Sequence, residues 1–319
     1  MNTPIISVNS WAIRWSRIGA IASVALVVLI QLIFGEINLS TQLVLALVAL
    51  VIGIPHGAID HLIAIPAKPR GRFIAYIAGY VAIAVLAGWA IATWNLIGFQ
   101  VVILMSALHF GFGDASFINE DRSAQEKEKN SLPTEVLYAL PAGFLPVILP
   151  LTDTRTLDAL ERIHPNLENW AGNQVSLFRN LTLLVGVLSL VYFLLTRRFS
   201  MAIDISILAV LALIAPPLIA FAVYFGFWHA LRHTARLVPK LPKAQQHILS
   251  GDWHKAIWSV VFPGLYAIAG TLIIAIGLMI ASPDNFSSSL LWSTLVIIWA
   301  LTVPHMATTS KFDFAALKK

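Results

Sequence analysis

The residues best suited to chemistry in this sequence are six histidines that lie inside long apolar segments. They are His56, His61, His109, His229, His233 and His305. An ionisable side chain inside a membrane segment is costly, so each one indicates a functional site by default. The three other histidines lie in polar segments, and we interpret them as ordinary surface residues: His164, His247 and His254.

The spacing of these side chains is compatible with a metal site. His229 and His233 are four residues apart, so on a helix both imidazoles lie on one face and could hold a single ion. Asp60 follows His56 at the same spacing, and its carboxylate could accept the ring N–H of that histidine and fix its tautomer. Two other roles for Asp60 stay open, a direct metal ligand or an ion-pair partner of Arg232. One histidine pair alone is a weak signal.

The ligand type and its aromatic neighbours favour oxidative chemistry on an apolar substrate. Neutral imidazole suits iron, zinc and copper, and four such ligands would leave two positions open on a six-coordinate iron(II). Aromatic residues lie beside the histidines in the sequence, and they predict either a flat apolar cleft for a long conjugated molecule or simply close packing of the helices. These residues are Phe110, Phe112, Phe117, Tyr224, Phe225, Phe227 and Trp228.

The elements that must position these residues are membrane-spanning helices. Of the 319 residues, 58% are hydrophobic and only 12% are charged, whereas a soluble domain carries about 25% charged residues. Continuous apolar runs of about 17 to 25 residues suit helices and exclude a barrel, whose strands alternate. We predict an all-α, polytopic transmembrane helix bundle of about ten helices, in one domain covering residues 1–319. The expected helices span residues 15–34, 42–65, 72–95, 98–118, 133–151, 178–196, 199–215, 218–238, 256–281 and 290–310.

Composition also excludes several kinds of site. The absence of cysteine excludes disulfides, thiolate metal sites and cysteine nucleophiles. The glycines show no phosphate-binding loop between a strand and a helix. The net charge of +5 does not indicate nucleic acid as a partner, because basic residues of membrane proteins flank their helices on the cytoplasmic side.

The basic residues predict how the chain is oriented in the cell membrane. Pro216 and Pro217 interrupt a long apolar stretch, where they make either a bend in one helix or a tight turn between two. With ten helices and a cytoplasmic N-terminus, only Arg155, Arg162 and Arg179 of the 21 basic residues fall outside. We therefore predict a multi-pass protein with both termini cytoplasmic.

One long external loop is expected near residues 152–178. It mixes both signs of charge with Leu157, Leu160 and Ile163, a spacing typical of an amphipathic helix lying in the membrane interface.

Depth in the membrane supports a single site. His56, His109, His229 and His305 each lie about 11 to 15 residues into a predicted helix that runs from outside to inside. At about 1.5 Å per residue, these depths agree within roughly one helical turn. Four different helices therefore offer histidine at one level, slightly to the cytoplasmic side of the midplane.

Four motifs surround the buried histidines. They are Gly53-Ile-Pro-His-Gly-Ala-Ile-Asp-His61, Ser106-Ala-Leu-His-Phe-Gly-Phe-Gly-Asp114, Tyr224-Phe-Gly-Phe-Trp-His-Ala-Leu-Arg-His233 and Thr302-Val-Pro-His-Met306. In content and order they resemble the Brp/Blh family of membrane carotene dioxygenases, over about four fifths of the chain. The usual description of that family has fewer helices than the ten predicted here.

The resemblance implies an iron-dependent enzyme that cleaves β-carotene at its central 15,15′ double bond with O2. Two molecules of retinal would result, often for a microbial rhodopsin. The Fe(II) ligands that it implies are His56, His109, His229 and His233. Three further motif residues carry no settled role: Asp60, His61 and His305.

Two other functions remain open from the sequence. The first is a membrane transporter whose intramembrane histidines relay protons or bind a metal in transit. The second is a related enzyme that acts on another isoprenoid.

Overall fold

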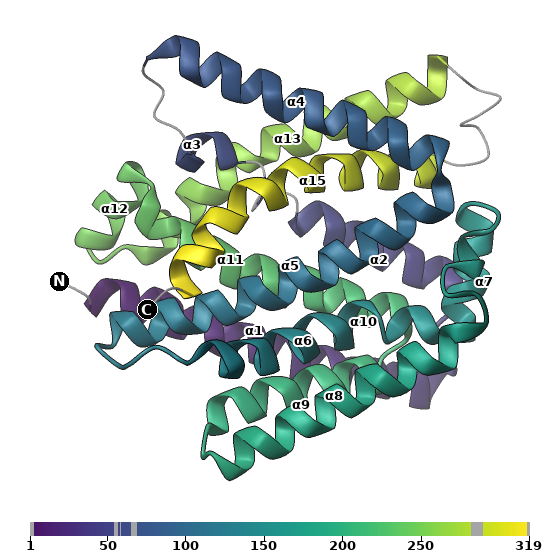
Figure 1. The fold of residues 1–319 in the computed structure, drawn as a ribbon, viewed down its shortest axis with the longest axis horizontal. Coiled ribbons are helices and arrows are strands. Elements are labelled where there is room, and N and C mark those ends of the chain that lie inside the picture. Colours follow the sequence, from purple (N-terminus) through teal and green to yellow (C-terminus); the bar gives the residue numbers. More distant parts are fainter. Residues whose placement is uncertain (1–2, 54–56, 58, 65–68, 282–289, 318–319) are drawn as a thin grey trace.

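The structure is a computed structural model, and it describes the chain except for residues 1–2, 54–56, 58, 65–68, 282–289 and 318–319 (Figure 1). The described residues form helices joined by turns, with no strand among them. The longest helices are α1 (Thr3–Phe34), α4 (Arg70–Thr93), α5 (Asn95–Ala124), α8 (Val175–Leu195), α13 (Trp253–Ala281) and α15 (Leu290–Leu317). Shorter apolar helices complete the bundle: α2 (Leu39–Gly53), α6 (Leu132–Val147) and α9 (Phe199–Ile214).

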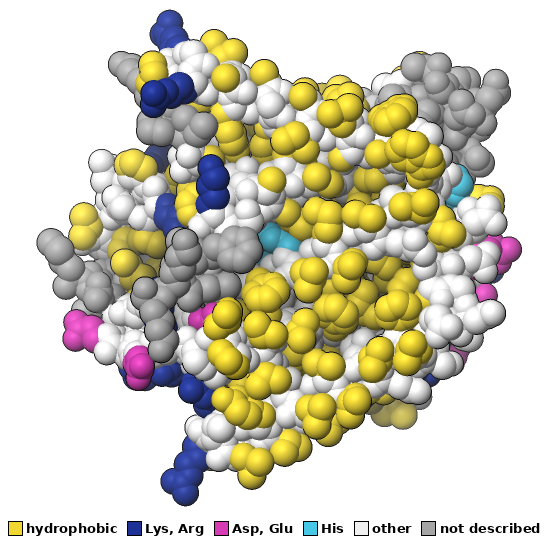
Figure 2. Space-filling view, in the orientation of Figure 1, with side chains coloured by type: hydrophobic (Ala, Val, Ile, Leu, Met, Phe, Trp, Pro, Cys, Tyr) yellow, Lys and Arg dark blue, Asp and Glu magenta, His cyan; other side chains and the backbone are white. Residues whose placement is uncertain are grey.

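The surface of the bundle is that of a membrane protein. Among the described residues, four helices are long and apolar enough to cross a bilayer, within 5–34, 70–93, 95–124 and 172–195. Figure 2 shows hydrophobic side chains over most of one face, with Lys and Arg gathered mainly at the end where both termini lie. An all-helical bundle is what a bilayer requires, since a helix satisfies its own backbone hydrogen bonds. The predicted fold class is confirmed.

Pro216 and Pro217 separate two helices rather than bend one. Helix α9 ends at Ile214, and Ala215 and Pro216 are extended, with ψ of 147° and 140°. A proline disfavours the helical conformation of the residue before it, which explains the extended Ala215. Helix α10 (Pro217–Val223) then begins on the second proline, where a missing backbone N–H costs nothing.

After α10 the backbone widens into one π-helical turn, η5 (Tyr224–His229), before α11 (Ala230–Leu237). Such turns occur mostly as single insertions and often at functional sites. This one carries the third histidine motif.

The predicted helix over 42–65 is wrong as a continuous element. The chain instead forms α2 and a short α3 (Asp60–Ala64), with Gly57 and Ile59 in a turn between them. The intervening sequence contains proline and glycine, which remove a backbone donor and favour other conformations than the helix.

The segment predicted to be an external loop contains a helix and short 3₁₀ turns. Helix α7 (Thr154–Ile163) is capped by Asp153, whose carboxylate accepts the backbone N–H of Arg155 at 2.9 Å. Leu160 and Ile163 are buried against the bundle. Its 3₁₀ turns are η2 (Pro150–Thr152), η3 (Leu167–Asn169) and η4 (Gly172–Gln174). In a separate part of the chain, α11 is followed by the 3₁₀ turn η6 (Val238–Lys240) and by helix α12 (Pro242–Leu249).

Close approach of two backbones fixes α5 against α6. A Cβ built on Gly111 would overlap the carbonyl of Ala139, and one on Gly143 would overlap the carbonyl of Ala107. Small residues let membrane helices pack by van der Waals contact where lipid gives no hydrophobic drive. Helix α5, which carries His109, is thereby held in place.

Candidate metal and substrate site

Four histidines from three parts of the chain meet in the bundle interior. The ring centre of His109 on α5 lies 5.5 Å from that of His229, 6.4 Å from His233 and 5.2 Å from His305. The rings of His229 and His233 are 5.8 Å apart, and those of His233 and His305 are 5.5 Å apart. All four side chains belong to buried residues.

These separations can be compared with those of metal-bound imidazoles. A ligating nitrogen lies about 2.1 Å from the metal, which puts ring centres roughly 4.5 to 6.4 Å apart across a four- to six-coordinate ion. The ring positions, and the neutral nitrogen donors that they carry, thus fit a transition-metal ion. Within the described residues, however, no three His, Asp or Glu side chains have donor atoms arranged to hold an ion. The distances between the rings therefore fit a metal site, whereas coordination of a metal by these four histidines stays a prediction.

Local features of the backbone make room for these rings. A Cβ on Gly113 would lie 3.3 Å from Cε1 of His229, and one on Gly57 would lie 3.2 Å from Nδ1 of His305. Both distances are tighter than ordinary van der Waals contact, so glycine at each position gives the neighbouring imidazole its space.

Asp60 binds His305, and its predicted pairing with His56 stays a prediction because His56 lies outside the described residues. Its Oδ2 lies 2.9 Å from Nδ1 of His305 and also accepts the hydroxyl of Tyr80 at 3.2 Å. A carboxylate only accepts hydrogen bonds, so Nδ1 of His305 carries the proton and Nε2 is the nitrogen available to a metal. The proposed ion pair with Arg232 is wrong.

Arg232 instead pairs with Asp204, at 3.0 Å, inside the bundle. Asp204 also binds Arg17 at 2.7 Å and accepts the hydroxyl of Tyr138 at 3.0 Å. The guanidinium lies 3.8 Å from the centre of the Trp228 ring. Arg232 is therefore held on the side of the bundle that faces α1 and α9.

A second carboxylate beside the cluster, Asp114, had no role in the sequence analysis. It is fully buried, and its Oδ1 lies 3.5 Å from Nδ1 of His229. Its Oδ2 accepts the indole N–H of Trp228 at 2.9 Å and the hydroxyl of Tyr224 at 3.4 Å. The sequence did contain a signal for Asp114, which is an acidic residue within an apolar helix. Burying a carboxylate there is as costly as burying a histidine, and so it indicates a functional role.

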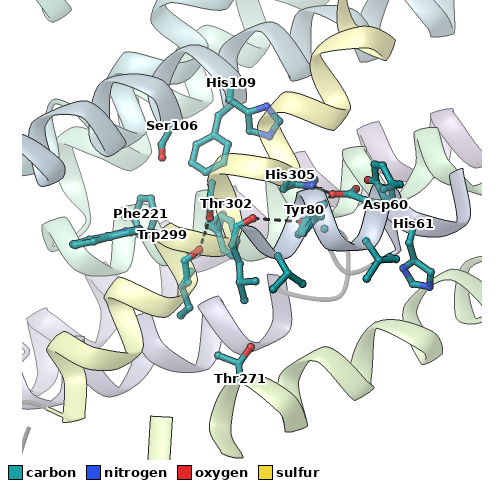
Figure 3. A pocket seen from close by; sticks show the side chains of 18 residues that line it. Asp60, His61, Tyr80, Ser106, His109, Phe221, Thr271, Trp299, Thr302 and His305 are labelled. Carbon is teal, nitrogen blue, oxygen red and sulfur yellow. Dashed lines mark hydrogen bonds and ion pairs between the residues drawn. The ribbon is translucent and has the colours of Figure 1, made fainter. Parts of the chain in front are cut away.

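A cavity of about 310 Å³ adjoins the histidines (Figure 3). His109 and His305 border it, with Asp60 and Tyr80 at one side and Phe221 and Trp299 at another. Most of its surface is apolar. It is suited to a hydrocarbon substrate held next to the imidazoles.

The seven predicted cleft aromatics divide into two groups. Phe110 and Phe225 line the cavity, whereas the other five, including the fully buried Phe117, do not. Tyr224 and Trp228 are fully buried, where their polar atoms hold Asp114. Phe227 is 49% exposed, and its ring packs near Gly19. The remaining one, Phe112, is partly buried against the core.

The other predicted histidines are distributed as follows. His61 lines the cavity edge and packs against Phe73, with ring centres 6.3 Å apart. His56 lies outside the described residues. His164, expected at the surface, is partly buried, and its ring centre lies 4.5 Å from that of Trp292.

Comparison with known proteins identifies a family. The sequence profile of the β-carotene 15,15′-dioxygenase family matches residues 47–313. The chain is 29% identical over 260 residues to the β-carotene 15,15′-dioxygenase of uncultured marine bacterium 66A03, covering 80% of this chain and 88% of that protein. It is 26% identical over 301 residues to the probable β-carotene 15,15′-dioxygenase Blh of Halobacterium salinarum, covering 83% and 82%. No solved structure matches the chain significantly.

The matched region runs from α2 into the last turns of α15, so it includes every histidine of the cluster and both carboxylates beside it. The chain belongs to the β-carotene 15,15′-dioxygenase family.

Proposed function

We propose that this protein is an iron-dependent membrane dioxygenase that cleaves β-carotene at the central 15,15′ double bond. The observation that carries the proposal is the buried cluster of four imidazoles bordering an apolar, aromatic-lined cavity in a membrane bundle. The reaction is balanced by its two reactants: the central C=C bond breaks, and each carbon receives one atom of O2. Two retinal molecules form, and no further reductant is needed.

Iron(II) held by His109, His229, His233 and His305 would supply oxygen activation next to the polyene. His56, matched by family resemblance, is a further ligand in this proposal. Asp60 accepts the Nδ1–H of His305 and so orients that ring, and Asp114 places a carboxylate oxygen 3.5 Å from Nδ1 of His229. The apolar walls exclude water and orient the central double bond of the substrate. Holding the reacting bond in this way contributes to the rate of the reaction.

The clustering of the histidines favours an enzyme over a transporter. A proton or metal relay needs polar groups spaced along a path across the membrane. The described histidines of the cluster instead lie with ring centres within 6.4 Å of His109. That arrangement is suited to one reaction centre.

The proposed location is the cell membrane, with both termini cytoplasmic. The carotenoid enters from the lipid, and the retinal product leaves into the same phase, where a microbial rhodopsin could receive it.

The test is to express the protein in cells that make β-carotene and to measure retinal by chromatography. We expect two retinal per β-carotene consumed, and loss of product in His109→Ala at unchanged membrane level. Iron content of the purified protein should fall in parallel. Retinal formation at the wild-type rate in His109→Ala would show that His109 is not part of the reaction site. Consumption of another isoprenoid without formation of retinal would show that the substrate is not β-carotene.

A further inference from the structure

A second, larger cavity, of about 1110 Å³, lies beside the first. Helices α4 and α15 form its two sides, and Ile274 of α13 and the end of α7 also border it. In Figure 1 these segments lie together at the top and right of the bundle. It is largely apolar, and its polar lining is concentrated near α7, where Glu161, Arg162 and His164 contribute to it.

The two cavities are adjacent. Tyr80, Val81 and Leu301 border both of them. The Tyr80 hydroxyl lies 3.4 Å from the carbonyl of Leu301 and 3.2 Å from Asp60, which holds His305 at 2.9 Å. Tyr80, at the boundary between the cavities, is therefore linked to His305 by two hydrogen bonds through Asp60.

Small residues on one face of α4 form the floor of the second cavity. Ala84, Gly88 and Ala92 line it at intervals of one helical turn. At Gly88 the approach to α15 is close, because a Cβ there would lie 3.3 Å from Cβ of Ala300. From Tyr80 to Ala92 the helix rises about 18 Å. One arm of a C40 carotenoid, from its central double bond to the far edge of its end ring, has a length of that order.

Aromatic rings line the far end of the second cavity, near the end of α7. The ring of Trp292 packs on His164 with centres 4.5 Å apart, and the Asn95 amide lies 2.9 Å from Nε2 of that histidine. Trp89 adds a second large ring to the lining. Flat rings of this kind pack well against a cyclic hydrocarbon end group.

We propose that the second cavity binds one arm of the polyene substrate, with its end ring near Trp292, so that the central double bond lies beside His109 and His305. This inference rests on the proposed function. The cavity is then a groove that positions the substrate. Its length from Tyr80 to Trp292 determines which double bond of the polyene lies beside the histidines. The three residues that this cavity shares with the histidine-lined cavity favour a substrate arm over a membrane lipid as the occupant.

The first experiment fills the groove. Ala84→Phe and Ala92→Phe place a ring within it, and Ala82→Phe is the matched control, since Ala82 is exposed on α4 and lines neither cavity. We expect retinal formation to fall roughly tenfold or more in the first two variants, because the double bond is displaced, and to stay at the wild-type level in the control. Ala92 is exposed, so its variant keeps the test valid if the buried Ala84→Phe fails to fold.

The second experiment measures occupancy without turnover. The chain has no cysteine, so Ala92→Cys and Ala82→Cys each carry a single thiol. Alkylation by an apolar maleimide in detergent is followed with and without β-carotene. We expect β-carotene to slow alkylation several-fold at position 92 and to leave position 82 unchanged.

Three results would overturn the inference. Retinal formation by Ala84→Phe and Ala92→Phe at the wild-type rate would remove the groove from the reaction. Equal alkylation with and without β-carotene would show that no carotenoid occupies it. Protection by a saturated phospholipid as strong as that by β-carotene would make it a lipid site. If the wild type forms no retinal, the proposed function fails, and the alkylation result alone decides whether the groove binds a carotenoid.

Discussion

At the scale of single residues, the site is a set of imidazoles oriented by carboxylates. His305 and His229 each have an aspartate at Nδ1, at 2.9 Å and 3.5 Å. Such a carboxylate fixes the tautomer of the ring and raises its basicity as a ligand. The two aspartates come from α3 and α5, so the orientation of the cluster depends on residues that do not border each other in sequence.

Asp114→Asn should weaken metal binding without unfolding the protein. The amide keeps the shape of the side chain and can still accept from Trp228, but it loses the charge beside His229. Loss of such a partner typically costs about 10- to 100-fold in metal affinity. The measurement is a titration of chelator-treated protein with ferrous iron, and Asp158→Asn on the exposed face of α7 is the control. Identical affinity in both variants would show that Asp114 does not tune the site.

Asp60 substitutions separate an orienting role from a ligand role. Asp60→Asn keeps an acceptor for His305 and should cause a mild defect. Asp60→Ala should lose roughly 10- to 100-fold in iron affinity, and excess iron should partly restore its activity. Iron content and retinal formation are measured side by side with His109→Ala. A loss as deep as that of His109→Ala, with no rescue by iron, would make Asp60 a ligand itself.

At the scale of elements, close contacts and one buried ionic network hold the helices that carry the site. Asp204 on α9 binds Arg17 on α1 and Arg232 on α11, so three helices share one charge cluster. Removing Asp204 would leave two arginines without their carboxylate, and breaking a buried ion pair in this way typically costs about 3 to 5 kcal/mol. The π-turn η5 lies directly before α11, and both are anchored through this contact.

Gly143→Ala should destabilise the packing of α5 on α6. Its new methyl group would overlap the carbonyl of Ala107, and relief requires the two backbones to separate. Overpacking of this kind costs about 1 to 3 kcal/mol. Thermal unfolding in detergent is the measurement, with Gly79→Ala as control, because a Cβ at Gly79 meets nothing within 4 Å. Equal midpoints for the two variants would contradict the close approach.

At the scale of the whole molecule, the distribution of charge predicts the orientation in the membrane. Reporter fusions after Lys243 and after Lys319 should both read cytoplasmic, because 21 basic residues are present and only Arg155, Arg162 and Arg179 then fall outside. The break at Pro216 agrees with separate crossings by α9 and α10. If the reporter fused after Lys243 lies on the external side, these two helices do not each cross the membrane.

The amino-acid sequence by itself predicted the fold class and the histidines of the candidate site. Apolar length is a local property, so the apolar spans were located, as for α9 at 199–215 against Phe199–Ile214, although α1 begins at Thr3 rather than at residue 15. The pair His229 and His233 was also predictable, since four residues separate neighbours on one face of a helix. The interruption after Gly53 was missed, because prolines and glycines are common inside membrane helices and do not always end them.

Only the tertiary structure decided which side chains meet. Asp60 is four residues after His56, yet its described histidine partner is His305, 245 positions away. The role of Asp114 and the place of His305 in the cluster likewise depend on how α5, α11 and α15 pack. The residues that line the cavity are also decided by tertiary packing. Phe110 and Phe225 line it, whereas Phe112 and Phe227, two residues away in the sequence, do not. Local spacing fixes the face of a helix, but the distance between helices is set by side chains far apart in sequence, such as Gly111 and Gly143, and no local pattern encodes it.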